Sequence, residues 1–146
     1  MGDRIRVVVL GTGQMGSGMI KLLLEKEGVD LVGVYGRRAE RAGTDVGDAV
    51  GLGRSIGVSL SSDLPKLLEE TQPHIVLQAT CSKVVDAVEE ILVILHHGAN
   101  VVSIAEEMSY PAYESPQAAQ EIHAMALEKG LTVVAVSYTH LTLPTN

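Results

Sequence analysis

The chain has 146 residues, of which 18 are acidic and 11 are basic, so its formal net charge is −7. This balance disfavours nucleic acid and anionic membranes as partners and favours a small-molecule substrate. No apolar run approaches the roughly 18 to 20 residues that a membrane-spanning helix needs, and the amino terminus does not resemble a signal peptide. The single cysteine cannot form an intrachain disulfide. We therefore expect a soluble, cytoplasmic protein.

The length predicts a single domain with a proper core. Because the chain contains neither Phe nor Trp, that core must be aliphatic. Short runs of Val, Leu, Ile and Ala recur along the sequence, as is typical of parallel strands that are covered on both faces.

The most informative stretch is the glycine motif GTGQMG at residues 11–16. A β-branched run, residues 5–10, precedes it, and a helical pattern that ends near Gly28 follows it. Gly11 allows a sharp exit from the strand, Gly13 lets a pyrophosphate approach the backbone, and Gly16 permits close helix packing. The first-turn N–H groups and the positive end of the helix dipole then face the anion. The alternative is a plain structural turn, but the strand–turn–helix context favours a dinucleotide site. Its predicted cofactor contacts are Gly11, Thr12, Gly13, Gln14, Met15 and Gly16.

The residues that follow the second predicted strand, residues 29–35, bear on the choice of cofactor. An acidic side chain there would accept the ribose hydroxyls of NAD(H), whereas arginine would favour the 2′-phosphate of NADP(H). Gly36 occupies the expected acid position, and Arg37 and Arg38 follow it. We expect NADP(H) to be preferred over NAD(H). Alternatively, the two arginines belong to a solvated loop.

The remaining elements alternate between strand and helix. Strands are predicted over residues 58–60, 74–79, 100–104 and 131–136, and helices over residues 42–49, 64–72, 83–97 and 117–129. Asp63 and its neighbouring serines offer capping oxygens for the second of these helices, which carries Pro65 in its first turn. The pattern predicts an α/β fold with a doubly wound parallel sheet of six strands, the Rossmann fold.

Polar residues at the carboxyl ends of the predicted strands are further candidates, because this fold binds ligands there. Thr80 and Ala105 would border the nicotinamide. Ser82 either contacts the cofactor or caps the next helix, and Glu106 either approaches the reacting groups or is an exposed loop acid. Other residues have simpler interpretations, namely burial for Cys81 and helix closure with Gly98 for His96 and His97. No general acid, general base or metal ligand is predicted.

The last ten residues, 137–146, differ from the rest of the chain. They carry no charge and show no helical or strand period. VSYTHLTLPT looks like the translation of a sequencing adapter, so we expect a nucleotide-binding domain over residues 1–136 and a non-native tail. A disordered tail or linker is the alternative. A tail of adapter origin would mean that a domain following residue 136 is missing.

Four stretches together carry a family resemblance: VVVLGTGQMGSGMIKLL, LVGVYGRRAERAGTDVG, IVLQAT and NVVSIAEEMSYP. Over residues 4–136 the chain resembles the N-terminal half of the dihydrodipicolinate-reductase-like oxidoreductases. The resemblance implies NAD(P)-linked, reversible oxidation of a C–N bond, with hydride passing to or from nicotinamide C4 and an imine hydrolysed to ketone and ammonia. It also implies a second, α+β domain that supplies substrate contacts and much of a homo-oligomer interface.

Two departures from this family bear on the substrate. Gln14 stands where dihydrodipicolinate reductases usually carry a basic residue, and residues 104–107 (IAEE) replace their Gly/Thr-rich segment. Both weigh against the lysine-pathway reductase. The resemblance within the family implies a diamino acid such as 2,4-diaminopentanoate as the expected substrate. Dihydrodipicolinate reduction, another Rossmann dehydrogenase such as a sugar or homoserine dehydrogenase, and a non-catalytic nucleotide sensor remain alternatives. We expect the 146-residue chain to bind its cofactor weakly and to be inactive alone.

Overall fold

The computed structural model describes residues 4–36, 39–79, 84–103 and 116–135. The first half contains β1 (Ile5–Leu10), α1 (Gln14–Glu25), β2 (Val29–Tyr35), the short 3₁₀ helix η1 (Ala39–Arg41), α2 (Val46–Ala49), β3 (Leu60–Ser61) and α3 (Leu64–Thr71). The second half contains β4 (Ile75–Gln78), α4 (Val84–His96), β5 (Asn100–Ser103), α6 (Pro116–Lys129) and β6 (Val133–Ala135).

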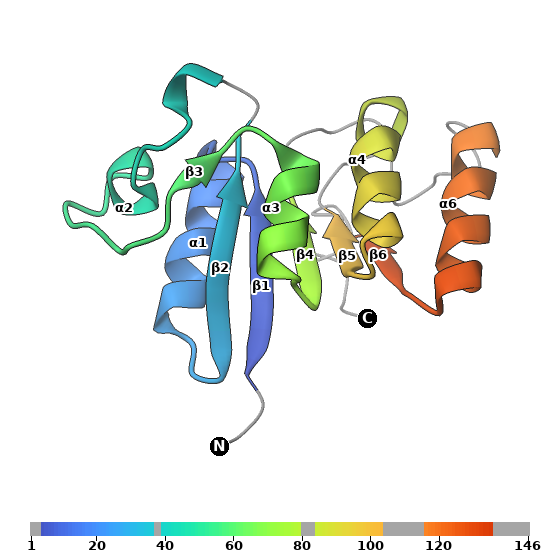
Figure 1. Cartoon of the computed structure of the whole chain (residues 1–146), viewed down its shortest axis with the longest axis horizontal. Coiled ribbons are helices and arrows are strands. Elements are labelled where there is room, and N and C mark those ends of the chain that lie inside the picture. The colour runs from blue at the N-terminus through green and yellow to red at the C-terminus, as the bar shows by residue number, and fades with distance from the viewer. Residues whose placement is uncertain (1–3, 37–38, 80–83, 104–115, 136–146) are drawn as a thin grey trace, which may run out of the picture.

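The strands form one sheet in the order β3-β2-β1-β4-β5-β6, and all neighbouring pairs are parallel. The chain winds outward from β1 to β3 on one side and from β4 to β6 on the other, so the winding reverses between β1 and β4 (Figure 1). Ligands of open parallel sheets bind outside the carboxyl ends of the strands at such a reversal. The predicted doubly wound sheet of six strands is confirmed.

The sheet separates two aliphatic cores, and β1 contributes to both. Val8 and Leu10 pack in the core beneath α3, α4 and α6. Val7 and Val9 belong to the opposite core, together with Ile20 of α1 and a buried valine of α2. This alternation follows from the two-residue period of a strand that is buried on both faces. In Figure 1, α3, α4 and α6 lie along one face of the sheet, and α1 lies on the other.

The third strand differs from the prediction over residues 58–60. It pairs with β2 over only two residues and starts later. Ser59 instead forms an isolated antiparallel bridge with Asp45, and the Val58 carbonyl accepts the Val46 amide at 2.7 Å. The segment that leads into α2 therefore pairs with the backbone of residues 58 and 59, which would otherwise have extended the strand. The other predicted strands and helices are present.

Local capping chemistry fixes the ends of α3 and α4. The amide of Lys66 donates to Asp63 Oδ1 at 3.2 Å, and Pro65 lies in the first turn of α3, where its missing N–H costs nothing. Gly98 follows α4 with a φ of +86°, the left-handed conformation of a helix stop. Among the helices of the described ranges, none is long and apolar enough to cross a membrane.

Candidate functional site

The turn between β1 and α1 is held in a sharp bend at Gly11. Its φ of +109° is one that residues with a side chain rarely adopt. The Gly11 amide donates a 2.8 Å hydrogen bond to the Tyr35 carbonyl at the end of β2. The bend is therefore anchored to the neighbouring strand, and it has the sharp exit from β1 that the sequence predicts.

The two later glycines of the motif differ in what surrounds them. A Cβ added to Gly16 would collide with the Gly11 carbonyl oxygen and lie 2.6 Å from the carbonyl carbon. At Gly13 the added Cβ would meet no atom of the described residues within 4 Å, and the φ of −71° suits any residue type. Packing among the described residues thus requires glycine at position 16 but not at position 13.

The missing side chain at Gly13 leaves the amino end of α1 open. Gly13 is the N-cap residue and has no side chain to cap the helix, and the first turn has no acidic residue. Ser17 does not cap this end, because its hydroxyl donates to the Thr12 carbonyl at 2.9 Å. Gly13, Gln14 and Met15 are exposed. Since helix amino ends attract anions through their N–H groups and dipole, this open cradle fits a diphosphate.

The cradle lies at the reversal of winding. Leu10, the last residue of β1, pairs with Gln78, the last residue of β4. The Ala79 amide donates to the Leu10 carbonyl at 2.8 Å. The glycine turn therefore leaves the sheet beside the end of β4, where doubly wound folds bind dinucleotides.

Gly36 lies where the sequence predicts the second determinant of cofactor choice. Its amide donates to the Ser61 carbonyl at 2.9 Å, which fixes it at the carboxyl ends of β2 and β3. An NAD-type acidic side chain is thus absent from this position. Several other candidate residues lie outside the described part of the chain: Arg37, Arg38, Thr80, Cys81, Ser82, Ala105 and Glu106.

A buried polar cluster beside the crevice was missed by the sequence analysis. Gln78 and Ser103 end neighbouring strands, pair in register and are fully buried. The Ser103 hydroxyl donates to Gln78 Oε1 at 2.8 Å, and Gln78 Nε2 donates to Glu90 Oε1 on α4 at 3.0 Å. A longer contact joins Gln78 Nε2 to the Ala87 carbonyl at 3.4 Å. The available signal was a polar residue near the end of each of two apolar strands, with an acid in the apolar helix between them.

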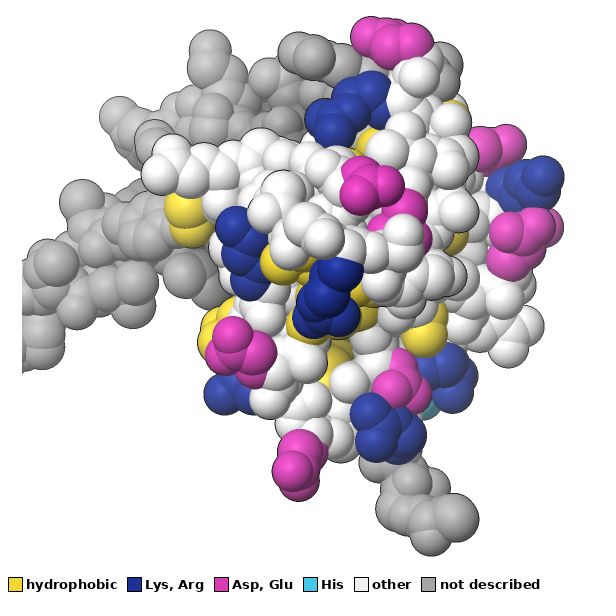
Figure 2. Space-filling view, turned by 90° about the vertical axis from the view of Figure 1, so that its left-hand side faces the viewer, with side chains coloured by type: hydrophobic (Ala, Val, Ile, Leu, Met, Phe, Trp, Pro, Cys, Tyr) yellow, Lys and Arg dark blue, Asp and Glu magenta, His cyan; other side chains and the backbone are white. Residues whose placement is uncertain are grey.

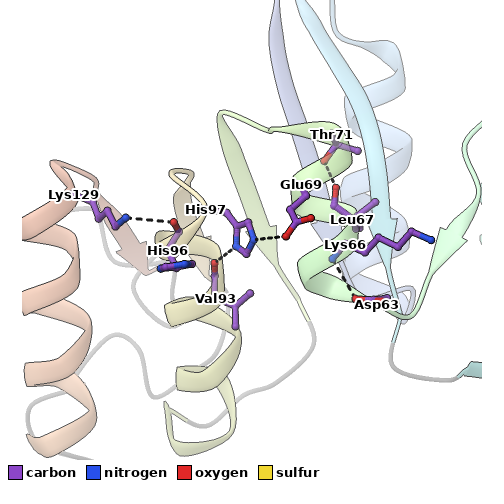
Figure 3. A network of polar contacts seen from close by, with 9 residues as sticks. All are labelled: Asp63, Lys66, Leu67, Glu69, Thr71, Val93, His96, His97 and Lys129. Atoms are coloured by element: carbon purple, nitrogen blue, oxygen red, sulfur yellow. Dashed lines mark hydrogen bonds and ion pairs between the residues drawn. The ribbon is translucent and has the colours of Figure 1, made fainter.

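His96 and His97 lie at the end of α4, as the sequence predicts. Figure 3 shows the His97 ring, whose Nδ1 lies 2.8 Å from the Val93 carbonyl and whose Nε2 lies 3.8 Å from Glu69 on α3. Lys129 of α6 reaches the His96 carbonyl at 3.5 Å. These contacts link three neighbouring helices. Within the described ranges, no group of three or more His, Cys, Asp or Glu residues is placed to hold a metal ion.

A cavity of about 450 Å³ lies at the opposite edge of the sheet. Its lining includes Arg6 near the start of β1, His74 just before β4 and Asn100 at the start of β5. These positions mark the amino ends of the strands. Because the glycine turn lies at the carboxyl ends, the cavity is not part of the candidate dinucleotide site.

Asp45 organises the loop that follows α2. Its carboxylate accepts the amides of Gly47 at 2.8 Å, Ile56 at 2.9 Å and Gly57 at 3.0 Å. Backbone hydrogen bonds, above all that from Ile56, hold the pKa of Asp45 below its ordinary value. Ionised Asp45 therefore stabilises the loop.

Figure 2 shows the side of the molecule on which α1 and α2 lie in Figure 1. Lys and Arg side chains are interspersed there with Asp and Glu, and hydrophobic side chains appear in small areas between them. This face carries mixed charge rather than a patch of one sign.

Comparison of the sequence with models of known protein families agrees with this geometry. The model of the family "Dihydrodipicolinate reductase, N-terminus" covers residues 5–104, from the start of β1 to just past the end of β5. The chain belongs to this family. The resemblance that the glycine motif and the strand ends indicated is thereby confirmed.

Three relatives show how much of a longer protein the chain covers. The 2,4-diaminopentanoate dehydrogenase of Acetoanaerobium sticklandii is 35% identical over 133 residues, which are 90% of this chain and 37% of the relative. The 4-hydroxy-tetrahydrodipicolinate reductase of Methanothermobacter thermautotrophicus is 37% identical over 102 residues, 67% of this chain and 36% of the relative. The solved amine dehydrogenase from Mycobacterium smegmatis has a TM-score of 0.83 and 43% identity, over 88% of this chain and 38% of that one. The chain thus spans little more than a third of each relative.

Proposed function

We propose that this chain is the nicotinamide-dinucleotide-binding domain of an oxidoreductase. The observation that carries the proposal is the open N-cap at Gly13, where protein packing does not require a glycine, at the winding reversal of the sheet. The backbone N–H groups of Gln14 and Met15 would hold the pyrophosphate, while Gly11 and Gly16 shape the bend. Membership in a family of reductase N-termini supports the same function.

For the complete protein we propose reversible oxidation of a C–N bond in a diamino acid such as 2,4-diaminopentanoate. The similarities to 2,4-diaminopentanoate dehydrogenase and to an amine dehydrogenase support this reaction class. The bound nicotinamide would supply or accept hydride at C4, and the substrate imine would be hydrolysed to ketone and ammonia. The described residues contribute binding and orientation. We assign the substrate contacts to a second domain after residue 136.

A second candidate is a dihydrodipicolinate reductase, which the similarity to 4-hydroxy-tetrahydrodipicolinate reductase favours. Gln14 in the glycine turn and the IAEE sequence of residues 104–107 weigh against it. A protein that also contains the proposed second domain would distinguish the two candidates. Its activity would be measured with 2,4-diaminopentanoate and with 4-hydroxy-tetrahydrodipicolinate.

We also propose a preference for NADP(H) over NAD(H). Gly36 offers no carboxylate to the ribose hydroxyls, and Arg37 and Arg38 would pair with a 2′-phosphate. The remaining proposals, for the complete protein, are a cytoplasmic location, a small-molecule substrate and a homo-oligomeric state. Residues 137–146 are proposed to be a non-native tail. The isolated chain should bind cofactor without turnover, and measured oxidation of any amino acid would contradict this.

The proposed function is tested by calorimetric titration of the chain with NADPH and NADH. The wild-type chain should bind both and bind NADPH more tightly. The double variant Arg37→Ala/Arg38→Ala should lose that preference, because the 2′-phosphate loses its cations. The matched control is Lys21→Ala/Lys26→Ala, which removes two exposed positive charges from α1 and its carboxyl end.

The outcomes separate the two parts of the proposal. An unchanged preference in the arginine variant would remove the argument for NADP(H) while leaving the dinucleotide site in place. An equal loss of preference in the lysine control would indicate a general charge effect. Absence of binding by the wild-type chain would contradict the function itself.

A further inference from the structure

In the polar cluster of Gln78, Glu90 and Ser103, the side-chain amide of Gln78 is held by a different partner at each end. Gln78 Oε1 faces Ser103 on β5, and Gln78 Nε2 faces Glu90 on α4. Both ends of the amide are thus satisfied within a core that is otherwise almost entirely aliphatic. An aliphatic side chain would fill this volume without desolvating an amide. What the polar cluster adds is a fixed relative position for β4, β5 and α4.

These strand ends lie where the second nucleotide of a dinucleotide is expected. Each half of a doubly wound sheet takes one nucleotide, and the diphosphate crosses the reversal between them. The glycine turn and Gly36 belong to the half formed by β1, β2 and β3. The nicotinamide half therefore falls over the ends of β4 and β5. Gln78 borders the crossing, because it pairs with Leu10 on one side and with Ser103 on the other.

We propose that Gln78 is a positioning residue for the nicotinamide. Through Ser103 and Glu90 it fixes the carboxyl ends of β4 and β5 against α4, and those ends in turn orient the nicotinamide half of the cofactor. Gln78 is fully buried and acts through the backbone around it. This inference rests on the proposed function and assigns nicotinamide orientation to one cluster.

The variant Gln78→Met tests the inference, because methionine is also unbranched but forms no comparable hydrogen bonds. Calorimetry compares NADH with ADP-ribose, which shares the adenosine diphosphate and ribose but lacks nicotinamide. NADPH and 2′-phospho-ADP-ribose form a second pair. We expect the variant to bind the nicotinamide-containing member of each pair about tenfold more weakly. The affinity for the two compounds without nicotinamide, ADP-ribose and 2′-phospho-ADP-ribose, should stay within about twofold of wild type.

Two further variants separate positioning from general stability. Val76→Ala removes packing from a fully buried residue in the same strand, so it should lower the unfolding midpoint without changing the affinity ratio of either pair. Ser103→Ala removes the hydroxyl that donates to Gln78 and should weaken nicotinamide binding selectively, as Gln78→Met does. It also provides the test if the methionine variant does not fold.

The controls decide the outcome in every case. The positioning role is overturned if the variants bind both members of a pair equally more weakly, or if they bind as tightly as wild type. It is also overturned if the wild-type chain gains no affinity from the nicotinamide. Each of these results leaves the dinucleotide site in place. A selective loss in Val76→Ala also overturns it. A wild-type chain that binds none of the four compounds removes the proposed function and, with it, this inference.

Discussion

The variant Gly13→Ala separates what the ligand requires from what the fold requires. The added methyl group would meet none of the atoms in the described part of the chain within 4 Å, and a φ of −71° is permitted for alanine. Gly-to-Ala changes at compatible positions stabilise by about 0.4–1 kcal/mol through the unfolded chain. The weaker capping preference of alanine costs several tenths of a kcal/mol or more. We therefore expect the free energy of unfolding to change by less than about 1 kcal/mol.

Cofactor binding should respond much more strongly. A diphosphate bound to the first-turn amides of α1 must approach them to about 2.9 Å, and the new methyl group stands beside those amides. Forcing an extra carbon into a close contact costs about 1–3 kcal/mol. The affinity for NADH, NADPH and ADP-ribose should fall by about 5- to 150-fold.

The matched control is Gly18→Ala, on the same helix. Gly18 is also exposed, and a Cβ there would meet nothing within 4 Å. Replacing glycine by alanine inside a helix stabilises by about 1 kcal/mol, and the affinities should stay at wild-type values. Urea unfolding gives the stabilities, and calorimetric titration gives the affinities.

Two results would refute this reasoning. Wild-type cofactor affinity in Gly13→Ala would mean that the diphosphate does not rest on this part of the backbone. Failure of Gly13→Ala to fold would mean that packing requires the glycine after all, so its open surroundings would no longer point to a ligand.

Three more substitutions test the account. Gly16→Ala forces a methyl group into the Gly11 backbone, so urea unfolding should show a loss of about 1–3 kcal/mol together with weaker cofactor binding; wild-type stability would contradict the packing argument. Asp45→Asn removes a carboxylate whose pKa is lowered by folding. The wild-type advantage should be present above the unfolded pKa of about 3.9 and decline as the pH falls through the lower, folded value, and an advantage that does not shrink on acidification would contradict this. Asp63→Ala removes the acceptor of the Lys66 amide and should cost about 0.5–2 kcal/mol, with early loss of hydrogen-exchange protection in α3; unchanged protection would mean that the cap is dispensable.

The turn between β1 and α1 could be predicted because its conformation depends on residues that are close together in the sequence. The positive φ of Gly11 and the tight contact at Gly16 are both encoded within six residues, as is the open N-cap at Gly13. The capping of α3 by Asp63 was predictable for the same reason. Each of these features depends on neighbours in the sequence rather than on partners across the sheet.

Other features depend on which distant segments meet. The length of β3 is set by the bridge between Asp45 and Ser59, which no local pattern indicates. The polar cluster joins Gln78 to Ser103, 25 residues away, and requires that the two strands be neighbours in register. The roles of Arg37 and Arg38 stay predictions.

The central claim is that a diphosphate rests on the amino end of α1, and backbone NMR tests it most directly. An isotope-labelled chain is titrated with ADP-ribose and then with NADH while all amide signals are followed. The account predicts that the largest shifts occur at Gly13, Gln14 and Met15 with both compounds. Shifts that spare this turn and gather instead around Arg6 and Asn100, at the opposite edge of the sheet, would contradict it.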